Sequence, residues 1–281
     1  MVFGGRKALG LVPSLDSITA HSVHFLQSRL ERRARSKATH YWRGTLAALL
    51  LAFSFGAVGY GLDQLVFFHP ALTAIAVFFV AKFLSLKISW QLFQNTPPAA
   101  NNDQCRQLAR QPIALFSNYY APAVVLFIAG GFTLLLPFSC LHAASLAAEK
   151  TQEESLFFRP FQRMRSVAAF PGEVIGTALL AIALLFWPTA NWSKGWLSVF
   201  RLGKSVKLWP LIMTAHAFNW SFERLDGERW TDSSKQKWLG PADGSAQLRP
   251  TDVKNALIVA LIAFGIANAL LGLLWLAAAI G

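Results

Sequence analysis

The chain has 281 residues, of which 54% are hydrophobic and only 14% are charged, whereas soluble domains average about 25% charged residues. Its formal net charge is +12, but the basic residues flank apolar runs, so attraction to anionic lipid explains them and we expect no nucleic-acid partner. The two cysteines form no Cys-x-x-Cys pair, which supports neither a disulfide scaffold nor a zinc site.

Residues 1–43 form a basic leader that lacks the apolar stretch of a cleavable signal peptide. Val23, Leu26 and Leu30 recur at helical spacing beside basic side chains. This pattern predicts a helix on the cytoplasmic leaflet, and a soluble basic helix packed on the membrane domain fits it equally well.

The first apolar run, residues 44–62, predicts a membrane span. Gly56, Gly59 and Gly61 lie near its end and allow close packing against a neighbouring helix. After a His-Pro turn, residues 70–86 predict a second span.

Residues 88–118 are polar and are expected to form a loop. A third apolar run covers residues 121–148, where Gly130-Gly131 and Pro137 predict a break in the helix. Residues 149–169 are charged and amphipathic and connect this run to the next.

A fourth span is predicted over residues 170–187, followed by a polar, basic, Trp-rich segment at 188–255. Residues 256–280 then run for 25 positions without a charged side chain, which is long enough to cross a hydrocarbon core of about 30 Å. The sequence therefore predicts an all-α integral membrane helical bundle with about five transmembrane spans plus amphipathic interfacial helices. Its two parts are the leader and a membrane domain at 44–281.

The distribution of basic residues predicts a multi-pass protein of the cell's inner (plasma) membrane with a cytoplasmic N-terminus. Five spans also place residues 188–255 inside. Residues 149–169, with four basic residues, then lie outside, which fits the positive-inside rule poorly. A re-entrant third or fourth segment is the alternative.

The short motifs give little chemistry. Gly203-Lys204-Ser205 looks like the end of a Walker A loop, but Ser198 stands where that loop needs a glycine, so a P-loop is rejected. The six histidines are scattered, without a His-Glu-x-x-His motif, and no metal site is expected. His142 and Asn268 fall within apolar runs and are predicted to face the bundle interior.

Tryptophan is concentrated between the fourth and fifth spans. Seven of the ten tryptophans lie there: Trp187, Trp192, Trp196, Trp209, Trp220, Trp230 and Trp238. One interpretation is an aromatic belt at the membrane interface. The other is a flat aromatic wall for a large planar ligand.

Several landmarks then follow one another in a recognisable order. They are His21-Ser22-Val23, Leu30-Glu31-Arg32-Arg33, Asn118-Tyr119-Tyr120-Ala121-Pro122, Phe170-Pro171, Trp209-Pro210 and Trp238-Leu239-Gly240. Together they resemble the CobD/CbiB family of integral membrane proteins of cobalamin (vitamin B12) biosynthesis, and the Tyr-x-Ala-Pro form resembles their relative AmpE. The resemblance covers nearly the whole chain, and it is carried by the collinear order of landmarks that are individually short.

The resemblance implies ATP-dependent amide coupling of adenosylcobyric acid to aminopropanol or its phosphate, with ATP and magnesium as cofactors if that activity is retained. Such chemistry needs carboxylates. Aligned from the landmarks, Ala144, Arg165 and Leu211 stand where the family has acids. We therefore expect the fold to be kept and the catalytic centre to be lost, and we assign no catalytic residue. The remaining carboxylates Glu149, Glu153, Glu154 and Glu173 are predicted to form a solvated face.

Three functions follow as hypotheses: a CobD/CbiB-like protein of cobalamin synthesis, a non-catalytic AmpE-like sensor or assembly partner, and a transporter. The lipid bilayer, a corrinoid and cobalamin-pathway proteins are the expected partners, and a homo-oligomer is compatible with them. If a ligand site remains, we expect it near the Trp-rich segment, without a metal. Its predicted residues are Asn118, Ser145, Trp209, Pro210, Trp238 and Gly240.

Overall fold

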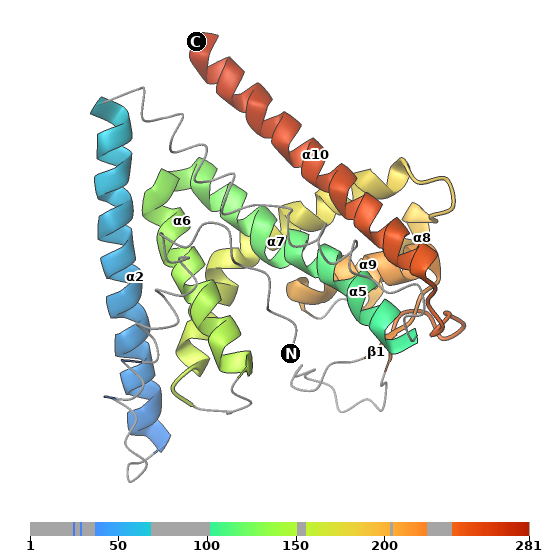
Figure 1. Cartoon of the computed structure of the whole chain (residues 1–281), viewed down its shortest axis with the longest axis horizontal. Helices are drawn as coiled ribbons and strands as arrows, with labels where there is room; N and C mark the ends of the chain where they lie inside the picture. The colour runs from blue at the N-terminus through green and yellow to red at the C-terminus, as the bar shows by residue number, and fades with distance from the viewer. Residues whose placement is uncertain are drawn as a thin grey trace, which may run out of the picture. The chain divides into compact units, whose positions relative to one another are not determined.

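The computed structural model describes residues 37–68, 102–150, 156–202, 205–223 and 238–280, together with Phe25 and Arg29. Its elements are α2 (Lys37–Phe68), α5 (Asn102–Leu115), the π-helix η1 (Phe116–Tyr120), α6 (Ala121–Lys150), α7 (Arg159–Leu185), α8 (Trp192–Leu202), the 3₁₀-helix η2 (Val206–Leu208), α9 (Trp209–Phe218), β1 (Phe222–Glu223), β2 (Trp238–Leu239) and α10 (Pro250–Ile280). Helices dominate (Figure 1), which confirms the all-α fold class.

Four helical stretches of the described chain are long and apolar enough to cross a membrane: Ala38–Phe68, Asn102–Leu146, Arg159–Leu185 and Pro250–Leu273. The chain is therefore a multi-pass membrane protein. The expected span at 70–86 and almost all of the leader lie outside the described residues.

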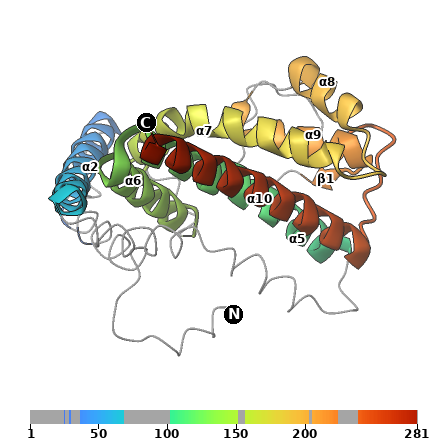
Figure 2. The same cartoon turned by 90° about the horizontal axis from the view of Figure 1, so that it is seen from above.

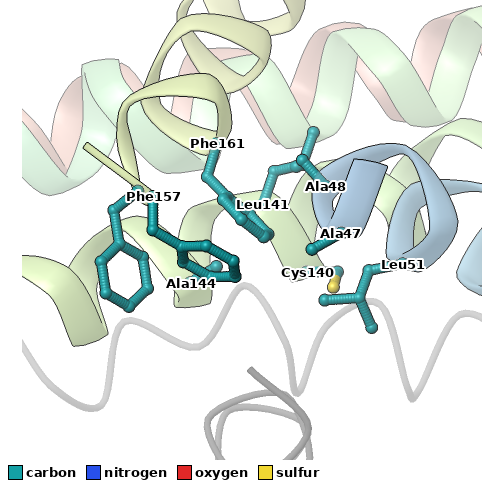
Figure 3. Close-up of a cluster of buried hydrophobic side chains, with 9 residues drawn as sticks. Ala47, Ala48, Leu51, Cys140, Leu141, Ala144, Phe157 and Phe161 are labelled. Carbon is teal, nitrogen blue, oxygen red and sulfur yellow. The ribbon is translucent and has the colours of Figure 1, made fainter. Parts of the chain in front are cut away.

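The chain divides into two compact units, residues 1–75 with 123–169 and residues 76–122 with 170–281. In the first unit, α2, α6 and the start of α7 bury an apolar cluster (Figure 3). Aromatic rings of the α7 start fill it beside small side chains of α2 and α6. Its members are Ala47, Ala48, Leu51, Cys140, Leu141, Ala144, Phe157, Phe158 and Phe161. Small residues on α2 let the large rings reach the neighbouring backbone.

Helix α2 approaches its neighbours through glycine. A Cβ atom added at Gly44 would lie 2.1 Å from the carbonyl oxygen of Phe157, and one at Gly59 would lie 2.2 Å from that of Phe132. Gly61 has no such neighbour within 4 Å. The glycines at 44 and 59 therefore permit backbone contact along one face of α2.

Helix α6 is broken where the sequence predicts a break. Gly130 (φ −162°, ψ 29°) and Gly131 (φ 60°, ψ −147°) leave the helical conformation, and the positive φ of Gly131 suits glycine. Pro137 lies inside the helix that follows. The break leaves N–H groups at the start of that second half without partners in their own helix, so they need an acceptor from elsewhere.

Asp63 of α2 supplies that acceptor. Its carboxylate accepts hydrogen bonds from the backbone N–H groups of Phe132 and Thr133, both at 2.9 Å, and from the Thr133 hydroxyl at 2.7 Å. A carboxylate at a helix N-terminus also interacts favourably with the helix dipole. The predicted end of the first span at residue 62 is too early, because α2 continues through this half-buried aspartate to Phe68.

In the second unit, α5 and α10 run side by side (Figures 1 and 2). The expected loop at 88–118 is wrong for residues 102–118, which are helical. Cys105, Ala109, Pro112 and Ile113 give α5 a buried face at helical spacing, and this face outweighs the polar composition. Residues 88–101 lie outside the described part.

The described parts of the Trp-rich segment form helices and a short sheet. Helix α8 packs on α9, and β1 pairs antiparallel with β2 through Phe222–Leu239 and Glu223–Trp238. The Arg106 guanidinium of α5 forms an ion pair with Asp103 and donates a hydrogen bond of 2.7 Å to the Ala246 carbonyl. The loop after β2 is thereby attached to α5.

Candidate functional site

Helix α7 crosses the junction between the π-helix η1 and the start of α6 at very close range in the second unit. A Cβ atom at Gly172 would lie 2.1 Å from the Pro122 Cα, and one at Gly176 would lie 2.8 Å from the Ala121 Cβ. Their four-residue spacing places both glycines on one face of α7. The arrangement is a small-xxx-small contact, the type that lets membrane helices meet backbone to backbone.

Glu173 follows Gly172 directly in α7. Only 4% of its surface is exposed, and the neighbouring Thr177 is 1% exposed. The prediction that Glu173 belongs to a solvated face is therefore wrong, because its side chain is buried. The side chains of Glu149, Glu153 and Glu154 lie outside the described residues.

The π-helix brings further polar groups to the same crossing. The Ser117 side chain is fully buried, and its hydroxyl donates a hydrogen bond of 2.8 Å to the Ile113 carbonyl. A Cβ atom at Gly176 would lie 3.4 Å from the Ser117 Cα. Single π turns inside helices occur frequently at functional sites, because the extra residue re-aims the side chains of one turn.

Tyr120, the last residue of η1, connects the crossing to α10. Its ring stacks on Phe116 with a centroid separation of 5.7 Å and meets Phe264 edge-on at 4.2 Å. The Tyr120 hydroxyl is buried, and it forms no hydrogen bond of ordinary geometry with any described residue. The side chain of Asn268 is its polar neighbour. The Asn268 amide donates a hydrogen bond of 2.7 Å to the Phe264 carbonyl.

The second unit thus places several polar side chains within segments that qualify as membrane spans, and all of them are buried except Asn268, which is exposed although it was predicted to face the bundle interior. We call Ser117, Tyr120, Glu173, Thr177 and Asn268 the crossing site. It offers a carboxylate, hydroxyls and an amide, which are groups that donate and accept hydrogen bonds. An ionisable side chain inside a membrane segment is costly to bury, and it is usually retained for function.

The structure also assembles no metal centre within its described part. Among those residues, no group of three or more His, Cys, Asp or Glu side chains lies together.

The site residues expected from the sequence lie in several elements. Asn118 is in η1, beside the crossing site, whereas Ser145 is in α6 of the first unit, where its hydroxyl donates a hydrogen bond of 2.8 Å to the Leu141 carbonyl. Trp209 and Pro210 open α9, and Trp238 opens β2.

Gly240 has a local structural task. Its φ is +142°, and an added Cβ would lie 2.2 Å from the carbonyl oxygen of Trp220. The Trp220 ring stacks on Phe218 at a centroid separation of 4.3 Å with planes 12° apart. Gly240, the last residue of the Trp-Leu-Gly landmark, therefore allows the backbone to turn close to Trp220, whose ring stacks on Phe218.

His216 of α9 gives a pH prediction. Burial lowers its pKa from the ordinary 6.5, and nearby Lys194 lowers it further, whereas Asp243 raises it. The His216 imidazole therefore binds a proton more readily in the unfolded chain than in the folded protein. The neutral imidazole contributes to the stability of the folded protein at neutral pH, and this stability is lost as the pH falls below about 6.5. We expect His216→Gln to flatten the pH dependence of unfolding free energy between about pH 7 and 5. An unchanged slope in detergent-solubilised protein would contradict the assignment.

A sequence signal for the crossing site existed in Gly172-x-x-x-Gly176, with a carboxylate between two glycines of an apolar run. The π turn had no comparable signal, because its residues also suit an α-helix. No family model, curated protein or solved structure matches this chain.

Proposed function

We propose that this chain is a CobD/CbiB-like and AmpE-like membrane protein that binds a corrinoid of cobalamin synthesis without catalysing amide coupling. One observation supports this most strongly. Two segments that carry the resemblance, at 118–122 and 170–171, come close together where α7 crosses the start of α6, because a Cβ atom at Gly172, the residue after the second segment, would lie 2.1 Å from the Pro122 Cα. Segments that resemble a family at distant places in the sequence are expected to meet where that family's function resides.

The chemistry of the crossing site supports recognition rather than synthesis. Glu173 is buried, and the visible groups include no cluster of oxygen ligands for a magnesium nucleotide among the described residues. A carboxylate is a strong acceptor for amide N–H groups, and a corrinoid carries amides at its rim. In this proposal Glu173 accepts such a bond, and Tyr120 and Asn268 supply polar contacts.

Equilibrium dialysis of the purified protein with adenosylcobyric acid tests the proposal, in parallel with an assay containing aminopropanol and ATP-magnesium. We expect the corrinoid to be retained and no amide product to form. Glu173→Gln should weaken binding about tenfold, the equivalent of about 1.4 kcal/mol, because a charged acceptor is lost. The matched control is Asp243→Asn at an exposed loop position, which should bind normally.

Two results would overturn the proposal in different ways. Product formation that depends on one carboxylate would restore the enzyme hypothesis. Absence of binding, together with normal cobalamin synthesis in a deletion strain, would exclude a role of this protein in cobalamin synthesis.

Transport is a second candidate, favoured by one specific observation. Discontinuous helices whose half-helix ends face polar groups are common at transporter binding sites, and α6 is broken at Gly130-Gly131 with Asp63 on its second half. Uptake of radiolabelled corrinoid into proteoliposomes tests it. Transport requires uptake above that of empty vesicles and its loss in Asp63→Asn, whereas binding without uptake favours the first proposal.

A further inference from the structure

Helix α8 presents an exposed aromatic face. Trp192, Trp196 and Phe200 recur every fourth residue, which places them on one side of the helix. Trp192 is 46% exposed and Phe200 is 71% exposed, and the Trp196 and Phe200 rings meet edge-on at 5.4 Å. Leu197, which is 53% exposed, widens this face.

The opposite side of α8 is fixed to α9 in the second unit (Figure 2). A Cβ atom at Gly195 would lie 2.7 Å from the Met213 carbonyl oxygen, so the two helices are in close contact. The Asn191 backbone N–H donates a hydrogen bond of 2.8 Å to the Ala217 carbonyl. The exposed rings therefore project from a helix whose orientation on α9 is set.

Basic side chains border the aromatic face. Lys194 and Arg201 are seven positions apart, so they share one edge of α8 next to Leu197. Both are exposed. A helix with large apolar rings on one face and basic residues along its edge is typical of segments that lie in the interface of an anionic bilayer.

The chain connection keeps α8 near the membrane. Helix α7, a candidate span, ends at Leu185, and α8 begins at Trp192. The intervening residues can reach at most about 24 Å when fully extended. Turn hydrogen bonds, from Phe186 N–H to the Ala183 carbonyl and from Ala190 N–H to the Trp187 carbonyl, shorten that connection.

We infer that the outer face of α8 docks into the headgroup region of an anionic bilayer. Trp192, Trp196, Leu197 and Phe200 enter the interface, and Lys194 and Arg201 contact the lipid phosphates. This inference is independent of the corrinoid proposal. The docking would hold α9 at a fixed depth beside the membrane.

An environment-sensitive fluorophore on Phe200→Cys tests this docking in full-length protein reconstituted into bilayers. Cys105 and Cys140 are both fully buried, so the new thiol is the accessible one among the described cysteines. The matched control is Gln247→Cys, at an exposed loop position. With phosphatidylglycerol present, nitroxide lipids should quench the probe at 200 and leave the probe at 247 largely unquenched.

The basic edge is tested by Lys194→Gln with Arg201→Gln in the Phe200→Cys background. Each basic side chain near an anionic surface contributes about fivefold, so the ratio of inserted to free probe should fall roughly 25-fold in anionic bilayers. Neutral phosphatidylcholine bilayers should show little effect of the same change. Gel filtration and circular dichroism check that the variants fold.

Three outcomes would overturn the inference. Equal quenching of the two probes would show that α8 is not at the interface. Quenching that is the same in anionic and neutral bilayers would remove the role of Lys194 and Arg201. A shielded probe that lipid nitroxides cannot quench would mean that a protein, rather than lipid, covers α8.

Discussion

Asp63→Ala should lower the free energy of unfolding by about 3 kcal/mol, because it removes the acceptor for three hydrogen bonds at the broken helix. The N–H groups of Phe132 and Thr133 would remain at a helix start inside a membrane segment, where water does not readily replace the lost partner. For a chain of this size, the change corresponds to a fall in melting temperature of roughly 10 °C. Unfolding in detergent micelles, followed by circular dichroism, measures it.

Two variants separate the capping role from general disruption. Thr133→Val removes the hydroxyl bond alone and should cost about 1 kcal/mol. Asp63→Asn keeps one carbonyl oxygen as an acceptor. Its loss of unfolding free energy should therefore lie between that of Thr133→Val and that of Asp63→Ala. If all three variants unfold like the unmodified protein, the cap does not stabilise α6.

Gly172→Ala should destabilise the second unit by about 3 kcal/mol. The added Cβ would lie 2.1 Å from the Pro122 Cα and 2.5 Å from its nitrogen, and backbone atoms cannot move aside as a flexible side chain can. Helix α7 would have to shift away from the start of α6. Thermal unfolding in micelles measures the loss.

Gly265→Ala in α10 is the matched control for this substitution. An added Cβ there meets nothing within 4 Å. Alanine also restricts the unfolded chain, so this variant should equal the unmodified protein or gain up to about 1 kcal/mol. Equal stability of the Gly172→Ala and Gly265→Ala variants would contradict the close crossing.

The sequence was sufficient for the all-α, multi-pass class and for the break in α6. In lipid, a long uncharged run satisfies its backbone hydrogen bonds by forming a helix. Gly130 and Gly131 have no Cβ, so the backbone can leave the helical conformation at that point of the run. It also indicated close packing at Gly59, which the short separation from Phe132 confirms. These features depend on residues close together in the chain.

Features that depend on a second helix were harder to predict. Asp63 looked like the residue after a span, but its role depends on the distant N–H groups of Phe132 and Thr133. Glu173 looked solvated, because its burial depends on how α7 packs in the folded chain. Helix α5 was missed because its polar residues masked the buried spacing of Cys105 and Ala109.

The central structural claim is that Glu173 is a sequestered carboxylate at the helix crossing. Treating the intact protein in bilayers with a water-soluble carbodiimide and a small amine, followed by peptide mass spectrometry, measures its access to water directly. We expect exposed Asp243 to be modified and Glu173 to react only after unfolding. Modification of Glu173 at the rate of Asp243 in the folded protein would contradict the burial of this carboxylate.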